Sequence, residues 1–156
     1  IVADPVLNAI PNTPDGAFQI AAVYMLVASP DFWVWRTFVS QAEITGTPSP
    51  DATTWNWTAY IARSQGERDC WRELFSIAEG VNYALTNIRQ AFADIFSGTQ
   101  NNAPAQRTHL TAMGRRKANR VEKLFATGTG STASPATMNF EGNLTIQDVQ
   151  DARNIP

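Results

Sequence analysis

The chain has 156 residues, of which 44% are apolar, enough for a hydrophobic core, and its formal net charge is −2. An isoelectric point of about 5.3 argues against a dedicated free-standing nucleic-acid-binding protein. The longest uninterrupted apolar run, residues 20–28, is far shorter than the roughly 20 residues of a membrane-spanning helix, so we expect no membrane partner.

The first predicted elements are two helices with similar start signals. Thr13 and Pro14 form a helix-start signal, and nearly continuous apolar residues after them predict a buried helix to about residue 27. Ser29 and Pro30 repeat the signal, and apolar residues at helical spacing predict a second helix to about residue 44. Residues 45–51 contain two prolines and a glycine, which is typical of a loop.

Three further helices are predicted over about residues 54–63, 67–79 and 82–96. Helical spacing places Cys70 on the inward face of the second of these helices. In the third, an apolar stripe runs through Phe92 and ends at a serine and a glycine, residues 97–98. We expect this stripe to pack against the next helix.

The segment from Pro104 to Ala126 is predicted to be one helix of about six turns, with an apolar stripe beside a basic one. Between residues 107 and 123, six lysines and arginines face a single acid, Glu122, which gives this stretch a net charge of +5. The basic stripe consists of His109, Arg116, Arg120 and Lys123. It fits a solvated face, a nucleic-acid surface or a complement to an acidic protein surface.

The residues after Ala126 are small, polar and flexible, and Gly128 and Gly130 are the predicted hinge of a C-terminal arm. Thr145 and Asp148 resemble a capping box that opens a last short helix. We therefore predict an all-α fold, a compact bundle of five or six helices with an extended C-terminal arm. Residues 1–126 form the helical body, and residues 127–156 form a flexible arm with a short extended piece and the terminal helix.

The sequence predicts no catalytic, metal or cofactor site. His109 is the only histidine, which excludes a multi-histidine metal site within one chain. Residues 128–132 resemble a phosphate-binding loop but follow a helix and lack its Gly-Lys-Ser/Thr ending. An enzyme that uses Cys70 as its nucleophile is an alternative, but a single cysteine without a secretory leader is more typical of a protein made in a reducing cytoplasm.

Aromatic residues occur on two faces of the short predicted helices, and the chain has five tryptophans. Some must fill the core, but a thin domain cannot bury both faces, and aromatic side chains are enriched at protein interfaces. The candidate interface residues are Trp33, Trp57, Phe140, Ile146 and Val149.

Several stretches resemble small structural proteins of tailed bacteriophages. The main one is residues 124–137, LFATGTGSTASPAT, which continues through residues 140–142 to residues 148–153, and residues 29–36 and 95–98 add to it. The resemblance is to components of the head-to-tail region, and it implies a compact helical body with an arm, assembled as a ring, often twelvefold, on the portal. It further implies portal and tail or neck proteins as partners, DNA passing through the lumen, and a place in the virion neck after synthesis in the host bacterial cytoplasm.

The resulting hypothesis is a non-enzymatic virion structural protein, a head-to-tail adaptor. The alternatives are a capsid decoration or tail structural protein, and a nucleic-acid-binding helical module that uses the basic segment 107–123.

Overall fold

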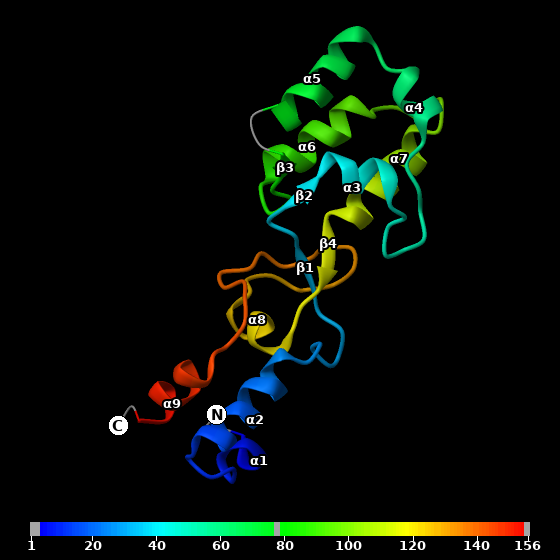
Figure 1. Ribbon diagram of the computed structural model, residues 1–156. Helices are drawn as coiled ribbons and strands as arrows, with labels where there is room; N and C mark the ends of the chain where they lie inside the picture. The colour runs from blue at the N-terminus through cyan, green and yellow to red at the C-terminus, as the bar shows by residue number, and fades with distance from the viewer. Residues whose placement is uncertain (1–3, 77–78, 155–156) are drawn as a thin grey trace. The chain divides into compact units, whose positions relative to one another are not determined.

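The computed structural model describes residues 4–76 and 79–154 (Figure 1). Over these ranges it contains nine helices and four short strands, so the fold is mixed α/β and the prediction of an all-α bundle is wrong. The helices are α1 (Pro5–Asn8), α2 (Pro14–Met25), α3 (Gln41–Gly46), α4 (Trp57–Ile61), α5 (Gln65–Ser76), α6 (Thr86–Ile95), α7 (Ala103–Met113), α8 (Arg120–Phe125) and α9 (Ile146–Asn154). The strands are β1 (Trp33–Trp35), β2 (Val39–Ser40), β3 (Gly80–Val81) and β4 (Arg115–Lys117).

The strands form two small sheets, one of β1 and β4 and one of β2 and β3. The second is antiparallel, with Val39 opposite Val81 and Ser40 opposite Gly80.

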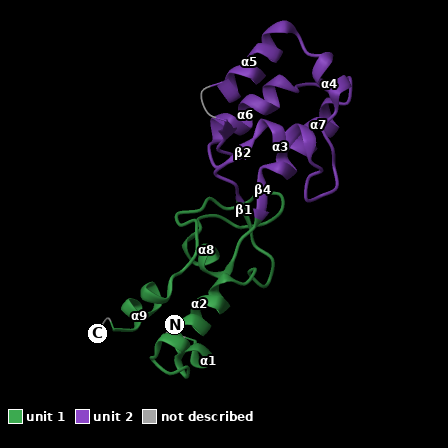
Figure 2. Ribbon diagram, viewed as in Figure 1, with its two compact units in different colours: residues 1–34, 117–156 green, residues 35–116 purple. Residues whose placement is uncertain are grey.

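The chain divides into two compact units (Figure 2). Unit 1 comprises Ile1–Val34 and Lys117–Pro156, and unit 2 comprises Trp35–Arg116. The sequence-based division lies at residue 126, whereas the structure groups residues 117–156 with the N-terminal residues.

In unit 1, the last helix packs along the first long one (Figure 1). Thr13 caps α2 as predicted, accepting a hydrogen bond from the Gly16 amide at 3.1 Å. One face of α2 then meets α9, and these helices together with α1 bury a cluster of Leu7, Ala17, Ile20, Ala21 and Val149. Phe18 of α2 is 61% exposed, so the prediction that the whole helix is buried is wrong. The predicted capping box is confirmed at Thr145, whose hydroxyl accepts from the Asp148 amide at 3.1 Å. The terminal helix is therefore part of the hydrophobic core of unit 1.

The helix predicted to run from Ser29 to about residue 44 is wrong, because its first part is extended. The Trp33 amide donates to the carbonyl of Gly130 at 2.7 Å, and the Trp33 carbonyl accepts from the Ala136 amide at 2.9 Å. These partners lie about a hundred residues away in sequence. Aromatic and β-branched residues also favour strands over helices, and Val34 is fully buried in this one.

The core of unit 2 is built around Trp71 of α5. The centroid of its ring lies 4.7 Å from that of Trp55, 4.9 Å from Phe75 and 5.6 Å from Phe92. Trp71 and Phe75 are four residues apart and so share the buried face of α5. Cys70 lies beside that face and is exposed, so the prediction that it points inward is wrong.

The predicted helix from Pro104 to Ala126 is also interrupted. Helix α7 ends at Met113, and at its C-cap, Gly114, a Cβ atom would lie 2.0 Å from the ring of Tyr83. Helix α8 then starts anew with a capping box, because the Asn119 side chain accepts from the Glu122 amide at 2.8 Å and the Glu122 carboxylate accepts from the Asn119 amide at 3.0 Å. The prediction of a single helix from Pro104 to Ala126 is therefore wrong.

Candidate interaction surfaces

A groove between α5 and α6 of unit 2 combines an apolar floor with charged side chains. Its volume is about 680 Å³, within the range of pockets that hold drug-sized ligands. We call it the α5–α6 groove, and its lining is Gly66, Glu67, Cys70, Glu73, Leu74, Ile88, Ala91, Asp94 and Ile95.

Helical spacing explains why these side chains line one groove. On α5, Gly66, Cys70 and Leu74 are each four residues apart, and on α6, Ile88 and Ala91 are three apart, so each set lies along one face. Small residues in both sets leave space between the helices. The groove floor is therefore largely apolar.

The rim of the α5–α6 groove carries three carboxylates, on Glu67, Glu73 and Asp94, and no cationic side chain belongs to the lining. Hydrogen bonds from Ser64 lower the pKa of Glu67, which keeps this carboxylate ionised. Arg63 balances it only in part, at an N···O distance of 4.0 Å. Among the described residues Glu73 has no ion-pair partner, so the rim has a net negative charge.

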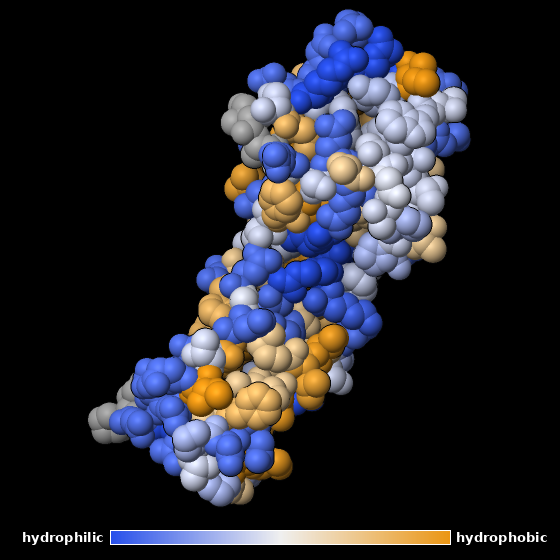
Figure 3. Space-filling view, in the orientation of Figure 1, coloured by the Kyte–Doolittle hydropathy of each residue, from blue (hydrophilic) through white to orange (hydrophobic). Residues whose placement is uncertain are grey.

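Unit 1 carries a surface of the opposite character on α8. Leu124 is 65% exposed and Phe125 is 53% exposed, next to the exposed Arg120 and the half-buried Lys123. We call these four residues the α8 ridge. The space-filling view shows apolar side chains gathered at the surface of unit 1 (Figure 3).

The four residues of the predicted basic stripe do not share a helix face. His109 is fully buried in unit 2, with Nε2 2.8 Å from the Ile44 carbonyl oxygen. Arg116 is partly buried in β4 and has its own interaction partners. Only Arg120 and Lys123 lie together, on α8.

Other bases of the segment 107–123 are engaged within their own units. Arg115 is buried and forms an ion pair with Asp51 in unit 2. In unit 1, Lys117 forms an ion pair with Asp31 at 2.7 Å. Arg107 donates to backbone carbonyls of unit 2. These contacts use charges that a phosphate-binding surface would need.

The candidate interface residues fall into different environments. Trp57 is exposed on α4, whereas Trp33 is half-buried in β1. Phe140 is half-buried, and its ring centroid lies 5.8 Å from that of Phe125. On α9, Val149 is buried against α2, so it contacts its own chain, while Ile146 is 40% exposed.

The two predicted hinge glycines lie in a loop that closes on β1. Gly130 has a φ of +65°, and a Cβ atom there would lie 2.2 Å from the ring of Phe32. Gly128 has a φ of +126°, and a Cβ atom there would lie 3.1 Å from Cα of Ala136. Both positions therefore require glycine for close packing and for a left-handed backbone.

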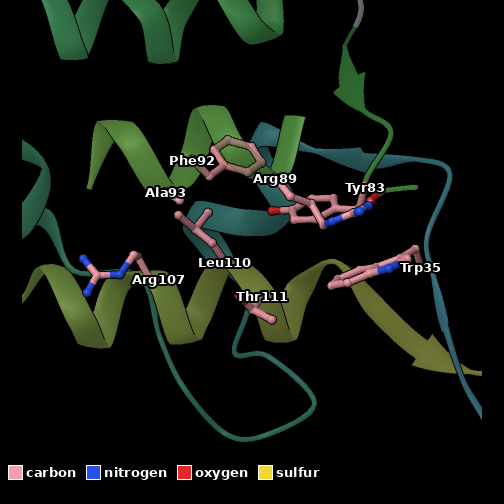
Figure 4. A pocket seen from close by; sticks show the side chains of 8 residues that line it. All are labelled: Trp35, Tyr83, Arg89, Phe92, Ala93, Arg107, Leu110 and Thr111. Carbon is pink, nitrogen blue, oxygen red and sulfur yellow. The ribbon is translucent and has the colours of Figure 1, made fainter. Parts of the chain in front are cut away.

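A small pocket of about 80 Å³ lies in unit 2 (Figure 4). The Arg89 guanidinium lies 4.5 Å from the centre of the Trp35 ring and donates to the Tyr83 carbonyl and the Thr86 hydroxyl. Burial raises the pKa of the Tyr83 hydroxyl, which has no hydrogen-bond partner among the described residues. The volume suits a few water molecules, and the pocket combines no nucleophile with a base.

Over residues 4–76 and 79–154, no group of three or more histidine, cysteine or acidic side chains could hold a metal ion. No helix in the same ranges is long and apolar enough to cross a bilayer.

Comparison with protein-family models, with curated protein sequences and with solved structures finds no match for this chain. The exposed apolar side chains, the α5–α6 groove and the α8 ridge are therefore the features from which a function can be inferred.

Proposed function

We propose that the protein is a non-enzymatic virion structural protein, a head-to-tail adaptor that assembles as a ring on the portal. The observation that carries this proposal is the number of large apolar side chains left exposed on both units. They are Val6, Phe18, Leu26, Val27, Phe38, Trp57, Ile61, Leu85, Leu124, Phe125 and Ile146. Contiguous exposed apolar surface marks sites of protein–protein contact, and apolar side chains gather at the surface of unit 1 (Figure 3). The resemblance to phage head-to-tail proteins supplies the class of partner.

The physical mechanism is burial of this surface between subunits. Each unit has its own hydrophobic core, so the exposed side chains are available for contacts with other molecules. Burial of apolar surface contributes about 25 cal/mol per Å². The partners in this proposal are further copies of the chain, the portal and tail or neck proteins, with DNA in the lumen. The C-terminal helix has a structural role in it, because α9 packs on α2.

The ion pairs of Arg115 and Lys117 count against the alternative of a direct nucleic-acid-binding module. A salt titration distinguishes the two functions. Phosphate contacts predict a steep loss of DNA affinity as salt rises, whereas an adaptor binds free DNA poorly at any physiological salt concentration.

Electron microscopy of the purified protein, alone and mixed with purified portal, tests the proposed function. We expect rings that sit on the portal. A protein that stays monomeric and binds neither portal nor tail proteins would contradict the proposal, and a regular array on the capsid surface would favour the decoration protein instead.

A further inference from the structure

We infer that the α5–α6 groove of one copy binds the α8 ridge of a second copy, in a head-to-tail contact between subunits. This inference rests on the association between copies that the proposed function requires, and it names the two surfaces that meet.

The first argument is the match of apolar surfaces. The groove offers Leu74, Ile88 and Ala91, which are partly exposed along its floor. The ridge offers Leu124 and Phe125, which are 65% and 53% exposed and stand on a short helix. A volume of about 680 Å³ accommodates two such side chains. Their burial removes apolar surface of both copies from water.

The second argument is charge complementarity. The groove rim carries Glu67, Glu73 and Asp94, and the ridge carries Arg120 and Lys123. Lys123 also lies near the ring of Phe32, with Nζ 5.6 Å from its centre, and the carboxylate of Glu122 is turned to the cap of α8. Among the described residues Arg120 has no ion-pair partner. An acidic rim around an apolar floor therefore meets two cationic side chains beside the exposed Leu124. In their own unit, Arg120, Lys123 and Leu124 line a hollow together with Asp4, Tyr24, Ala28 and Ser29.

The third argument concerns geometry. The two surfaces are different patches of one chain, so a contact between them is heterologous. Each copy can then use its groove for one neighbour and its ridge for another. Such contacts produce closed rings or open filaments, in contrast to a symmetric dimer. The proposed ring requires this type of contact.

The test uses two variants at exposed positions, Leu124→Asp in the ridge and Glu73→Lys in the groove, in the full chain. Each is expected to raise the dissociation constant for self-association at least about tenfold in sedimentation velocity. Thr108→Asp is the control for the added negative charge, because Thr108 is exposed and belongs neither to the two surfaces nor to the exposed apolar side chains. Circular dichroism checks that each variant folds.

A mixing experiment identifies the head-to-tail geometry. Each variant alone should be monomeric, whereas an equal mixture should form dimers and nothing larger, because only one intact groove and one intact ridge remain. Cys70, the chain's single cysteine, lines the groove, so self-association should slow its alkylation several-fold. Leu124→Asp should restore the rate of the monomer.

The outcomes separate the contact from the proposed function. One outcome is that the wild type assembles, alone or on purified portal, and that both variants assemble equally well. That result would contradict the groove–ridge contact but not the proposed ring. If the variants lose portal binding but keep self-association, the groove binds a different protein, which also overturns the inference. A wild type that is monomeric both alone and with portal overturns both proposals.

Discussion

His109 Nε2 lies 2.8 Å from the carbonyl oxygen of Ile44, and this hydrogen bond connects α7 to the end of α3 inside unit 2. The contact requires a proton on Nε2, so in the neutral ring Nδ1 is the acceptor, and the Thr53 hydroxyl lies 3.2 Å from it. Both ring nitrogens are thus engaged by the chain itself. The single histidine has a structural role in the core.

Replacement of this histidine should destabilise unit 2. His109→Ala leaves a cavity and removes the partner of the buried Ile44 carbonyl, so we expect a loss of about 2–4 kcal/mol of unfolding free energy. Urea denaturation followed by tryptophan fluorescence measures it, because Trp55 and Trp71 lie in the same core. The exposed neighbour Thr108→Ala is the control, with an expected change within about 0.5 kcal/mol. Equal stability of the two variants would contradict this role of His109.

A comparison of Gly130 with Gly98 distinguishes the cost of a positive φ from the cost of a steric clash. Both have positive φ, +65° and +78°, but only Gly130 has a ring, that of Phe32, in the position of a Cβ atom. Gly98→Ala should cost about 1 kcal/mol, and Gly130→Ala at least about 2 kcal/mol, because overpacking adds to the backbone strain. Thermal unfolding of the two variants measures the difference in stability. Hydrogen exchange of residues 127–137 shows whether the loop that contains Gly130 is loosened in Gly130→Ala. A freely hinged segment would tolerate Gly130→Ala as well as Gly98→Ala.

The ion pair of Arg115 with Asp51 should contribute more to the free energy of unfolding than the exposed pair of Arg72 with Asp69. Arg115 is buried, whereas both members of the second pair are largely exposed. Arg115→Met keeps much of the side-chain packing but leaves Asp51 without this partner, so we expect a loss of about 2–3 kcal/mol. Arg72→Met should change stability by less than about 0.5 kcal/mol. Chemical denaturation of the two variants checks the ranking.

Val149 and Ile146 lie on the same helix but differ in burial. Val149→Ala should weaken the docking of α9 on α2 by about 1–3 kcal/mol, since Val149 packs against Ile20 and Ala21. Ile146→Ala, at a position that is 40% exposed, should cost less than half as much. Hydrogen exchange of the α9 amides provides the measurement. Equally fast exchange in the wild type and in Val149→Ala would show that the C-terminal segment is a flexible arm, as the sequence predicts.

The capping box of α9 should make its stability depend on pH. Hydrogen bonds from Thr145 lower the pKa of Asp148. Because the folded pKa is below the unfolded one, this contribution is complete above the ordinary aspartate value, about 3.9, and is lost as the pH falls through the lowered value. Protection of the α9 amides should therefore decline at acidic pH in the wild type. Asp148→Asn should show weaker protection without that step, and the exposed Asp151→Asn should behave like the wild type.

The candidate surfaces were only partly visible in the sequence. Residues 107–123 do carry an excess of positive charge. Of the predicted basic stripe, however, only Arg120 and Lys123 belong to the α8 ridge. The acids of the α5–α6 groove alternate with arginines along the chain, which is typical of a solvated helix face. They become one rim only when α5 packs against α6. That packing brings Asp94 to the same groove as Glu67 and Glu73.

Elements whose signals act over three or four residues can be predicted from the sequence. Thr13 starts α2, Thr145 with Asp148 starts α9, and apolar spacing places Phe92 in the core, because capping and helical periodicity are local. The tertiary structure alone decided that residues 33–35 are a strand, because their hydrogen-bond partners at Gly130 and Ala136 are distant in sequence. It also decided that His109 is buried, since the carbonyl of Ile44 that it contacts becomes a neighbour only after the chain has folded.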